Sequence, residues 1–129
     1  MITPAVIRAL EEINANFPEC KQVVREDGEG GAYVIVEDVP IGAPFAQATS
    51  WVGFRITFQY PYADVYPVFV RADLTRVDGK PVLGEAMSQT TFEGRSAIQL
   101  SRRSSKLNPA IDTAVLKLLK VLKWLKSRP

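Results

Sequence analysis

The stretch WVGFRITFQY, residues 51–60, decides the fold through the way its side chains alternate in type. Apolar side chains take every second position and polar ones stand between them: Phe54, Ile56 and Phe58 against Arg55, Thr57 and Gln59. A period of two is typical of an antiparallel strand that packs one face on a core and exposes the other. The stretch therefore predicts a half-buried strand in the middle of the chain.

Three further strands are predicted around this one, and turn residues bound each of them. They are KQVVRE at 21–26, AYVIVEDV at 32–39 and VFVRADL at 68–74. The sequence DGEGG at 27–31 signals a hairpin between the first two. Residues 76–96 carry the turn signals VDGK and LGE with little periodicity, so this segment is expected to be irregular. We therefore expect a four-stranded antiparallel meander followed by an irregular segment.

A helix is predicted at each end of the chain. Near the N-terminus, Thr3 is a capping residue, Pro4 suits the first helical position, and apolar residues recur at helical spacing up to Phe17. Near the C-terminus, Asn108 is expected to cap a helix that starts at Pro109. Its apolar stripe consists of Ile111, Val115, Leu118, Leu122 and Leu125. The lysines of its solvated side are Lys117, Lys120 and Lys123. The chain of 129 residues is expected to form one α+β domain over 1–129.

The composition excludes several classes of protein. The chain is 47% apolar and 23% charged, which is a globular composition, and its apolar runs are too short for a transmembrane helix. Glu11 and Glu12 stand where a signal peptide would be apolar, so we expect a cytoplasmic protein with no membrane partner. It has no histidine and only one cysteine, Cys20. These absences argue against a metal site, a cofactor and the usual nucleophile–histidine pairs.

Charge is unevenly distributed, although the formal net charge is only +2. Residues 1–94 hold seven Lys and Arg against thirteen Asp and Glu, whereas residues 95–129 hold nine against Asp112 alone. This polarity indicates an acidic partner for the basic part. Nucleic acid is disfavoured, because the basic residues are not interleaved with aromatic ones and the net charge is small.

Two parts of the chain resemble ubiquitin-conjugating enzymes. FRITFQYPYADVYP, residues 54–67, is similar to the third strand of that family and the Tyr-Pro turn after it. GRSAIQLSRRSSKLNPAIDTAVLKLLKVLKWL, residues 94–125, is similar to the family's catalytic segment and crossover helix, with Ile98 and Leu100 as the apolar flanks. The resemblance implies the ubiquitin-conjugating-like fold: an N-terminal helix, the meander, an active-site-like segment and a crossover helix.

The residues that carry the family's chemistry are replaced. Gln99 stands at the position of the catalytic cysteine, and a carboxamide forms no thioester. Thr91 stands where the family has the asparagine that supports the oxyanion. The proline pair that usually follows the Tyr-Pro turn is also missing. Thioester chemistry is therefore not expected, and Cys20 is interpreted as a structural residue.

Two functions of different class follow from the resemblance. One is a non-catalytic variant, like the ubiquitin-enzyme variants and RWD domains, that binds a ubiquitin-like protein or its activating or conjugating partner. The other is an atypical conjugating enzyme that carries its modifier as an oxyester on a serine of 96–105, the candidates being Ser101, Ser104 and Ser105. The residues expected to bind the partner are Arg102, Arg103, Lys117 and Lys120. Such compact chains resemble bacterial branches of the superfamily, which are often linked to antiphage defence. A third interpretation is a plain α+β domain whose resemblance to the family is accidental.

Overall fold

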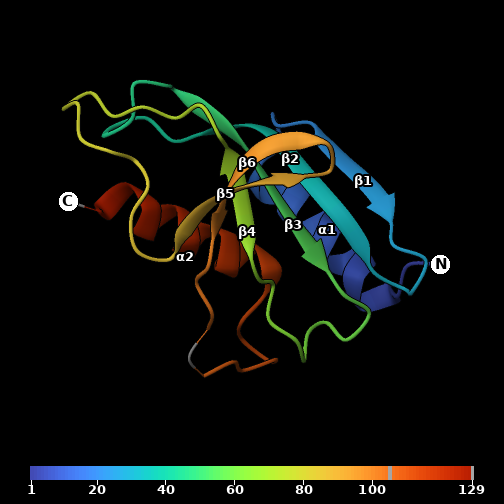
Figure 1. The fold of residues 1–129 in the computed structure, drawn as a ribbon. Coiled ribbons are helices and arrows are strands. Elements are labelled where there is room, and N and C mark those ends of the chain that lie inside the picture. Colours follow the sequence, from blue (N-terminus) through green and yellow to red (C-terminus); the bar gives the residue numbers. More distant parts are fainter. Residues whose placement is uncertain (105, 129) are drawn as a thin grey trace.

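The computed structural model describes residues 1–104 and 106–128, and there it contains two helices and one antiparallel sheet of six strands (Figure 1). The predicted α+β class is confirmed. The elements are α1 (Pro4–Asn16), β1 (Gln22–Glu26), β2 (Ala32–Pro40), β3 (Thr49–Ile56), β4 (Val68–Arg71), β5 (Met87–Phe92), β6 (Arg95–Leu100) and α2 (Ala114–Ser127). The order of strands across the sheet is β1-β2-β3-β4-β6-β5.

The N-terminal helix and the four predicted strands are present in the expected order. Thr3 Oγ1 accepts a hydrogen bond from the Val6 amide at 3.3 Å and caps α1, and Pro4 is the first helical residue. Strands β1 to β4 pair antiparallel with their neighbours, as a meander requires. None of the described helices is long and apolar enough to cross a membrane.

Both helices lie on one face of the sheet, and the main core forms between them and the strands (Figure 1). Every second residue of the central strands faces the helices: Val34 and Val36 of β2, Val52, Phe54 and Ile56 of β3, Val68 and Val70 of β4, and Ile98 and Leu100 of β6. Leu118 and Leu125 of α2 and Ile13 of α1 are almost fully buried against them. The period-two interpretation of residues 51–60 is thereby confirmed for β3, although the strand ends at Ile56.

The expectation of a four-stranded sheet and an irregular segment after it was wrong. Residues 87–92 form β5, and residues 95–100 form β6, which pairs with β4 on one side and with β5 on the other. The sequence of β5, MSQTTF, shows no apolar alternation because four of its residues are exposed at the edge of the sheet. The sequence signal for this hairpin was the pair Glu93-Gly94. Both residues have positive φ and form its tight turn.

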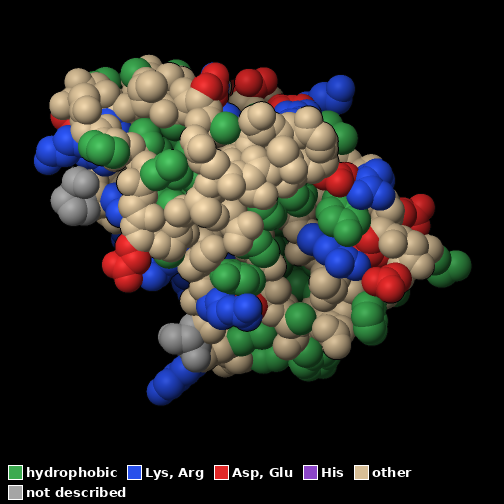
Figure 2. Space-filling model, in the orientation of Figure 1, with side chains coloured by type: hydrophobic (Ala, Val, Ile, Leu, Met, Phe, Trp, Pro, Cys, Tyr) green, Lys and Arg blue, Asp and Glu red, His purple; other side chains and the backbone are tan. Residues whose placement is uncertain are grey.

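The β5–β6 hairpin bends over the face of the sheet opposite to the helices, so that its tip lies above β3, β2 and β1. Phe92, only 7% exposed, packs on Phe69 with ring centroids 4.5 Å apart. Glu93 is paired with Arg25 of β1 at 2.7 Å. Figure 2 shows uncharged atoms over the middle of this face and acidic and basic side chains mixed along its right-hand side.

The second helix begins later than predicted. α2 starts at Ala114 with Thr113 as its cap, not at Pro109 with Asn108. Asn108 instead caps a turn, since its side-chain oxygen accepts a hydrogen bond from the Ala110 amide at 3.0 Å. Ile111 is therefore 61% exposed and does not belong to the apolar stripe of the helix.

Candidate functional site

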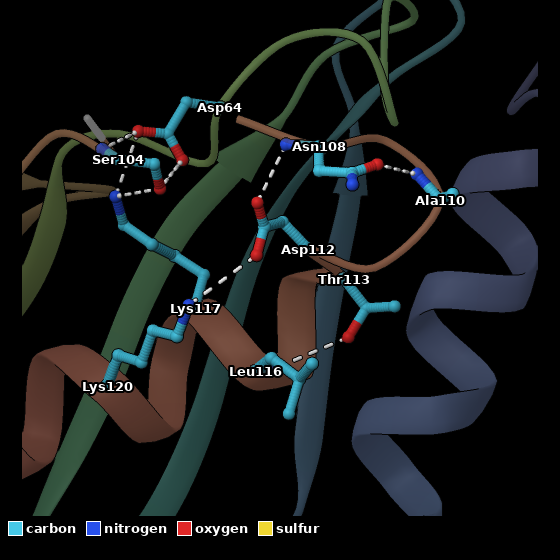
Figure 3. Close-up of polar contacts among 9 residues, drawn as sticks. All are labelled: Asp64, Ser104, Asn108, Ala110, Asp112, Thr113, Leu116, Lys117 and Lys120. Carbon is cyan, nitrogen blue, oxygen red and sulfur yellow. Dashed lines mark hydrogen bonds and ion pairs between the residues drawn. The ribbon is translucent and has the colours of Figure 1, made fainter. Parts of the chain in front are cut away.

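The loop of residues 101–113, which joins β6 to α2, is held to the rest of the molecule by Asp64 (Figure 3). The Ser104 amide donates to Asp64 Oδ2 at 2.8 Å, and the Ser104 hydroxyl donates to Oδ1 at 3.0 Å. Lys117 Nζ donates to the same Oδ2 at 2.9 Å. One carboxylate thus binds the loop and the first turns of α2 together.

Lys117 is buried, whereas the sequence placed it on the solvated side of the helix. Its side chain is 8% exposed, and that of Asp64 is 16% exposed. The ammonium group also donates to the Arg102 carbonyl oxygen at 2.6 Å. A buried lysine needs such partners because an unpaired buried charge is very costly. Lys117 is therefore part of the support under the loop and is not displayed to a partner.

The pKa of Asp64 lies below its usual value as the net result of opposed effects. Burial raises this pKa, but the hydrogen bonds from the Ser104 amide, Lys117 and the Ser104 hydroxyl outweigh it. A carboxylate with a lowered pKa is a weak base. Asp64 therefore stabilises the loop better than it would take a proton from the Ser104 hydroxyl.

A second carboxylate holds the end of the loop. Asp112 Oδ2 accepts from the Asn108 amide at 2.7 Å, and Lys120 Nζ lies 3.5 Å from Oδ1 (Figure 3). The amide of Asn108 and the charge of Lys120 lower the pKa of Asp112. Thr113 then caps α2 by accepting from the Leu116 amide at 3.3 Å. The loop is built from local turns and is fastened at both ends.

Between this loop and α2 runs a hollow that we call the basic groove. It consists of a cavity of about 210 Å³ and an adjoining one of about 170 Å³. The side chains of Arg102 and Trp124 line both cavities. The other cations on its walls are Arg103, Lys106, Lys117, Lys120 and Arg128. Of the four residues predicted to bind a partner, the structure brings Arg102, Arg103 and Lys120 to this groove as exposed residues.

Aromatic rings lie beneath the two arginines of the loop. The Arg102 guanidinium carbon is 5.1 Å from the centroid of the Trp124 ring, and that of Arg103 is 4.1 Å from the centroid of Tyr66. These are cation–π distances. No aromatic residue is interleaved with the basic ones of 101–106 in the sequence, but folding brings Tyr66 and Trp124 from other parts of the chain against Arg103 and Arg102.

The positions inferred from the resemblance lie in the sheet. Gln99 is in β6, between Phe69 of β4 and Ser88 of β5, and its side-chain amide donates to Ser101 Oγ at 3.1 Å. Thr91 is exposed on β5 and pairs with Ser96. Gln99 and Ser101 lie together, but the structure does not bring them to the carboxylate of Asp64. Ser105 lies outside the described residues.

Cys20 is not set up as a nucleophile. Burial raises the pKa of its thiol, and the charges of Asp38 and Glu19 raise it further. Its Sγ lies 3.5 Å from the Asp38 carbonyl oxygen. A thiol with a raised pKa forms little thiolate at neutral pH, which agrees with the interpretation of Cys20 as a structural residue.

Sequence reasoning missed Asp64, Tyr66 and Trp124 as members of this site. Asp64 stands 40 residues before Ser104 and 53 before Lys117, so no local pattern joins them. The one local signal was Asp64 itself, an acidic residue in the loop between Pro61 and Tyr66.

The fold and this site define an α+β domain with a basic groove along its last helix. Comparison of the chain with known protein families, with curated proteins and with solved structures finds no match.

Proposed function

We propose that this protein is a binding domain of the ubiquitin-conjugating-like kind, without the catalytic cysteine, in a ubiquitin-like modification pathway of bacteria. It binds a ubiquitin-like protein or its activating or conjugating partner. The proposal rests on the sequence resemblance over residues 54–67 and 94–125. The order of a helix, a meander of four strands and a later helix on the same face is compatible with it.

The observation that carries binding over catalysis is the hydrogen bonding of Asp64. Burial raises the pKa of Asp64, but hydrogen bonds from the Ser104 amide, the Lys117 ammonium and the Ser104 hydroxyl lower it below its usual value, so the carboxylate beside Ser104 is a weak base. A serine needs a base within reach in order to attack an acyl group. Three exposed cations remain available beside this support, namely Arg102, Arg103 and Lys106.

The alternative is an atypical conjugating enzyme with an oxyester on Ser104. One observation favours it: the Ser104 hydroxyl lies 3.0 Å from Asp64 Oδ1 and 3.4 Å from Lys117 Nζ, distances that suit a nucleophile with a carboxylate and an amine beside it. In that mechanism the hydroxyl oxygen attacks the carbonyl of the thioester that joins the modifier to the activating enzyme, and the hydroxyl proton passes to Asp64. The C–S bond breaks, and the sulfur leaves as a thiolate that then takes the proton.

The test is incubation with the activating enzyme and the ubiquitin-like protein encoded beside the gene, with ATP, followed by intact mass under denaturing, non-reducing conditions. The binding function predicts no adduct, together with co-elution with one of these proteins in native gel filtration. An adduct that withstands thiols, yields to mild base and is lost in Ser104→Ala would establish the oxyester enzyme instead. An adduct that thiols remove would point to Cys20, with Cys20→Ser as its control.

A further inference from the structure

We propose that the basic groove binds an extended acidic segment of a partner protein, in which successive Asp or Glu carboxylates meet Arg103, Arg102 and Lys106. This deepens the proposed function and rests on it for the pathway from which the partner comes.

Lys117 and Lys120 of the groove pair with Asp64 and Asp112, but three other cations of its walls differ from the arginines of the sheet. Arginines elsewhere form close ion pairs, among them Arg25 with Glu93, Arg55 with Asp27 and Arg95 with Glu37. Within residues 1–104 and 106–128, no carboxylate forms an ion pair with Arg102, Arg103 or Lys106. A surface that leaves neighbouring cations unpaired is complementary to an anionic partner.

The arginines also lie over aromatic rings. Arg102 over Trp124 and Arg103 over Tyr66 make cation–π contacts, and such contacts restrict a side chain while its N–H groups can still bind other acceptors. A planar guanidinium donates two parallel hydrogen bonds to one carboxylate. The Asp64 carboxylate holds the backbone of the loop at Ser104. The loop therefore loses little further conformational freedom when the acidic segment binds, which lowers the entropic cost of binding.

The shape of the groove suits a chain more than a compact ligand. Its cavities, about 210 and 170 Å³, are each smaller than the roughly 300–1,000 Å³ of small-molecule sites. They adjoin across Arg102 and Trp124, as pockets for successive side chains of an extended segment would. Asp112 and Glu85, at opposite ends, would repel carboxylates and so limit the acidic segment to the middle.

Single-stranded nucleic acid would also meet cations and aromatic rings here. Base stacking, however, needs a free ring face. Trp124 has Arg102 and Arg128 over its ring, at 5.1 and 5.2 Å from the centroid, and Arg103 lies over Tyr66. The position that a base would take is thus held by guanidinium groups, and carboxylates are the better match.

The experiment is fluorescence anisotropy with a short fluorescein-labelled peptide of alternating Glu and Ser, added to the full chain. We expect saturable binding that added salt weakens. In the double variant R102E/R103E we expect affinity to fall at least about tenfold, since hydrogen bonds between charged groups are lost and repulsion is added. Both residues are exposed, so the variant should fold, which its circular dichroism and urea midpoint would verify.

The matched control is K123E/K126E, which makes the same change of charge on exposed positions of α2 that line neither cavity. Its affinity should fall less than about threefold, as long-range screened charge effects are small. Equal losses in the two double variants, or no binding of the peptide by the full chain, would overturn the proposal. Tighter binding of oligo-dT than of the peptide, sensitive to R102E/R103E, would replace it with a nucleic-acid site.

A second readout places the ligand. The chain has two tryptophans, and in the Trp51→Phe variant only Trp124 remains. The peptide should then change the emission of Trp124, and an unchanged emission at saturation would contradict binding across this ring. The two proposals can fail separately. If a ubiquitin-like partner binds R102E/R103E as tightly as the parent chain, the groove is not its binding site. If the peptide binds but no ubiquitin-like partner does, the proposed pathway is wrong.

Discussion

At the scale of single residues, Asp64 joins two parts of the chain that are distant in sequence. Its two oxygens accept from Ser104 and Lys117, which belong to the loop and to α2. Because the pair with Lys117 is largely buried, removing one charge leaves the other without a partner.

We expect Asp64→Asn to lower the free energy of unfolding by about 3 kcal/mol, since it leaves the Lys117 ammonium buried without its counter-charge. Urea denaturation followed by circular dichroism measures this. Asp73→Asn is the control, because Asp73 is 69% exposed in its pair with Arg71 and should cost less than about 1 kcal/mol. A loss in Asp64→Asn no larger than that of the control would contradict the role given to Asp64.

The same carboxylate predicts a dependence on pH. Its pKa is lowered in the folded protein, so its contribution to stability is present above the ordinary carboxyl pKa of about 4 and is lost as pH falls through the lowered value. The difference in unfolding free energy between the parent chain and Asp64→Asn should therefore shrink as the pH is lowered from 6 to about 3. Urea titrations of both proteins across this range measure it, and a constant difference would refute the assignment.

At the scale of elements, the β5–β6 hairpin depends on a glycine in another strand. A Cβ added to Gly53 of β3 would lie 2.6 Å from Phe92 Cε2, closer than real contacts allow. Glycine at this position lets the ring of Phe92 lie flat on the sheet beside Phe69 and Trp51. The hairpin thus packs by a match between two elements that are remote in sequence.

Gly53→Ala should lower the unfolding free energy by about 2 kcal/mol, because the methyl group displaces the Phe92 ring. The same substitution in a Phe92→Leu background should cost markedly less, since the smaller side chain can give way. A double-mutant cycle by chemical denaturation measures the coupling. Additive losses would show that Gly53 and Phe92 do not interact in this way.

At the scale of the whole molecule, the layers predict which backbone amides are protected. Strands β2, β3, β4 and β6 have a neighbour on each side and the helices beneath, whereas β1 and β5 are edges. In native-state hydrogen exchange the amides of the four inner strands should exchange slowest, approaching the rate of global unfolding. Amides of β5, at the edge of the sheet, should exchange at least about tenfold faster, and equal protection of β5 and β3 would contradict this order.

Sequence alone determined the parts that depend on near neighbours. Alternation over residues 51–60 and capping by Thr3 predicted β3 and α1, because periodicity and capping act within a few residues. The hydroxyl and basic candidates of 101–106 were likewise visible as a cluster.

Tertiary structure alone decided the rest, since contacts between distant residues leave no local pattern. β5 is polar and is defined by pairing with β6, and α2 begins at Ala114 because Asp112 and Asn108 close a turn before it. Helical spacing predicted Lys117 on the solvated side of the helix, yet its side chain is buried because its ammonium group pairs with the Asp64 carboxylate. The basic groove forms only on folding, which brings Trp124 and Tyr66 against Arg102 and Arg103.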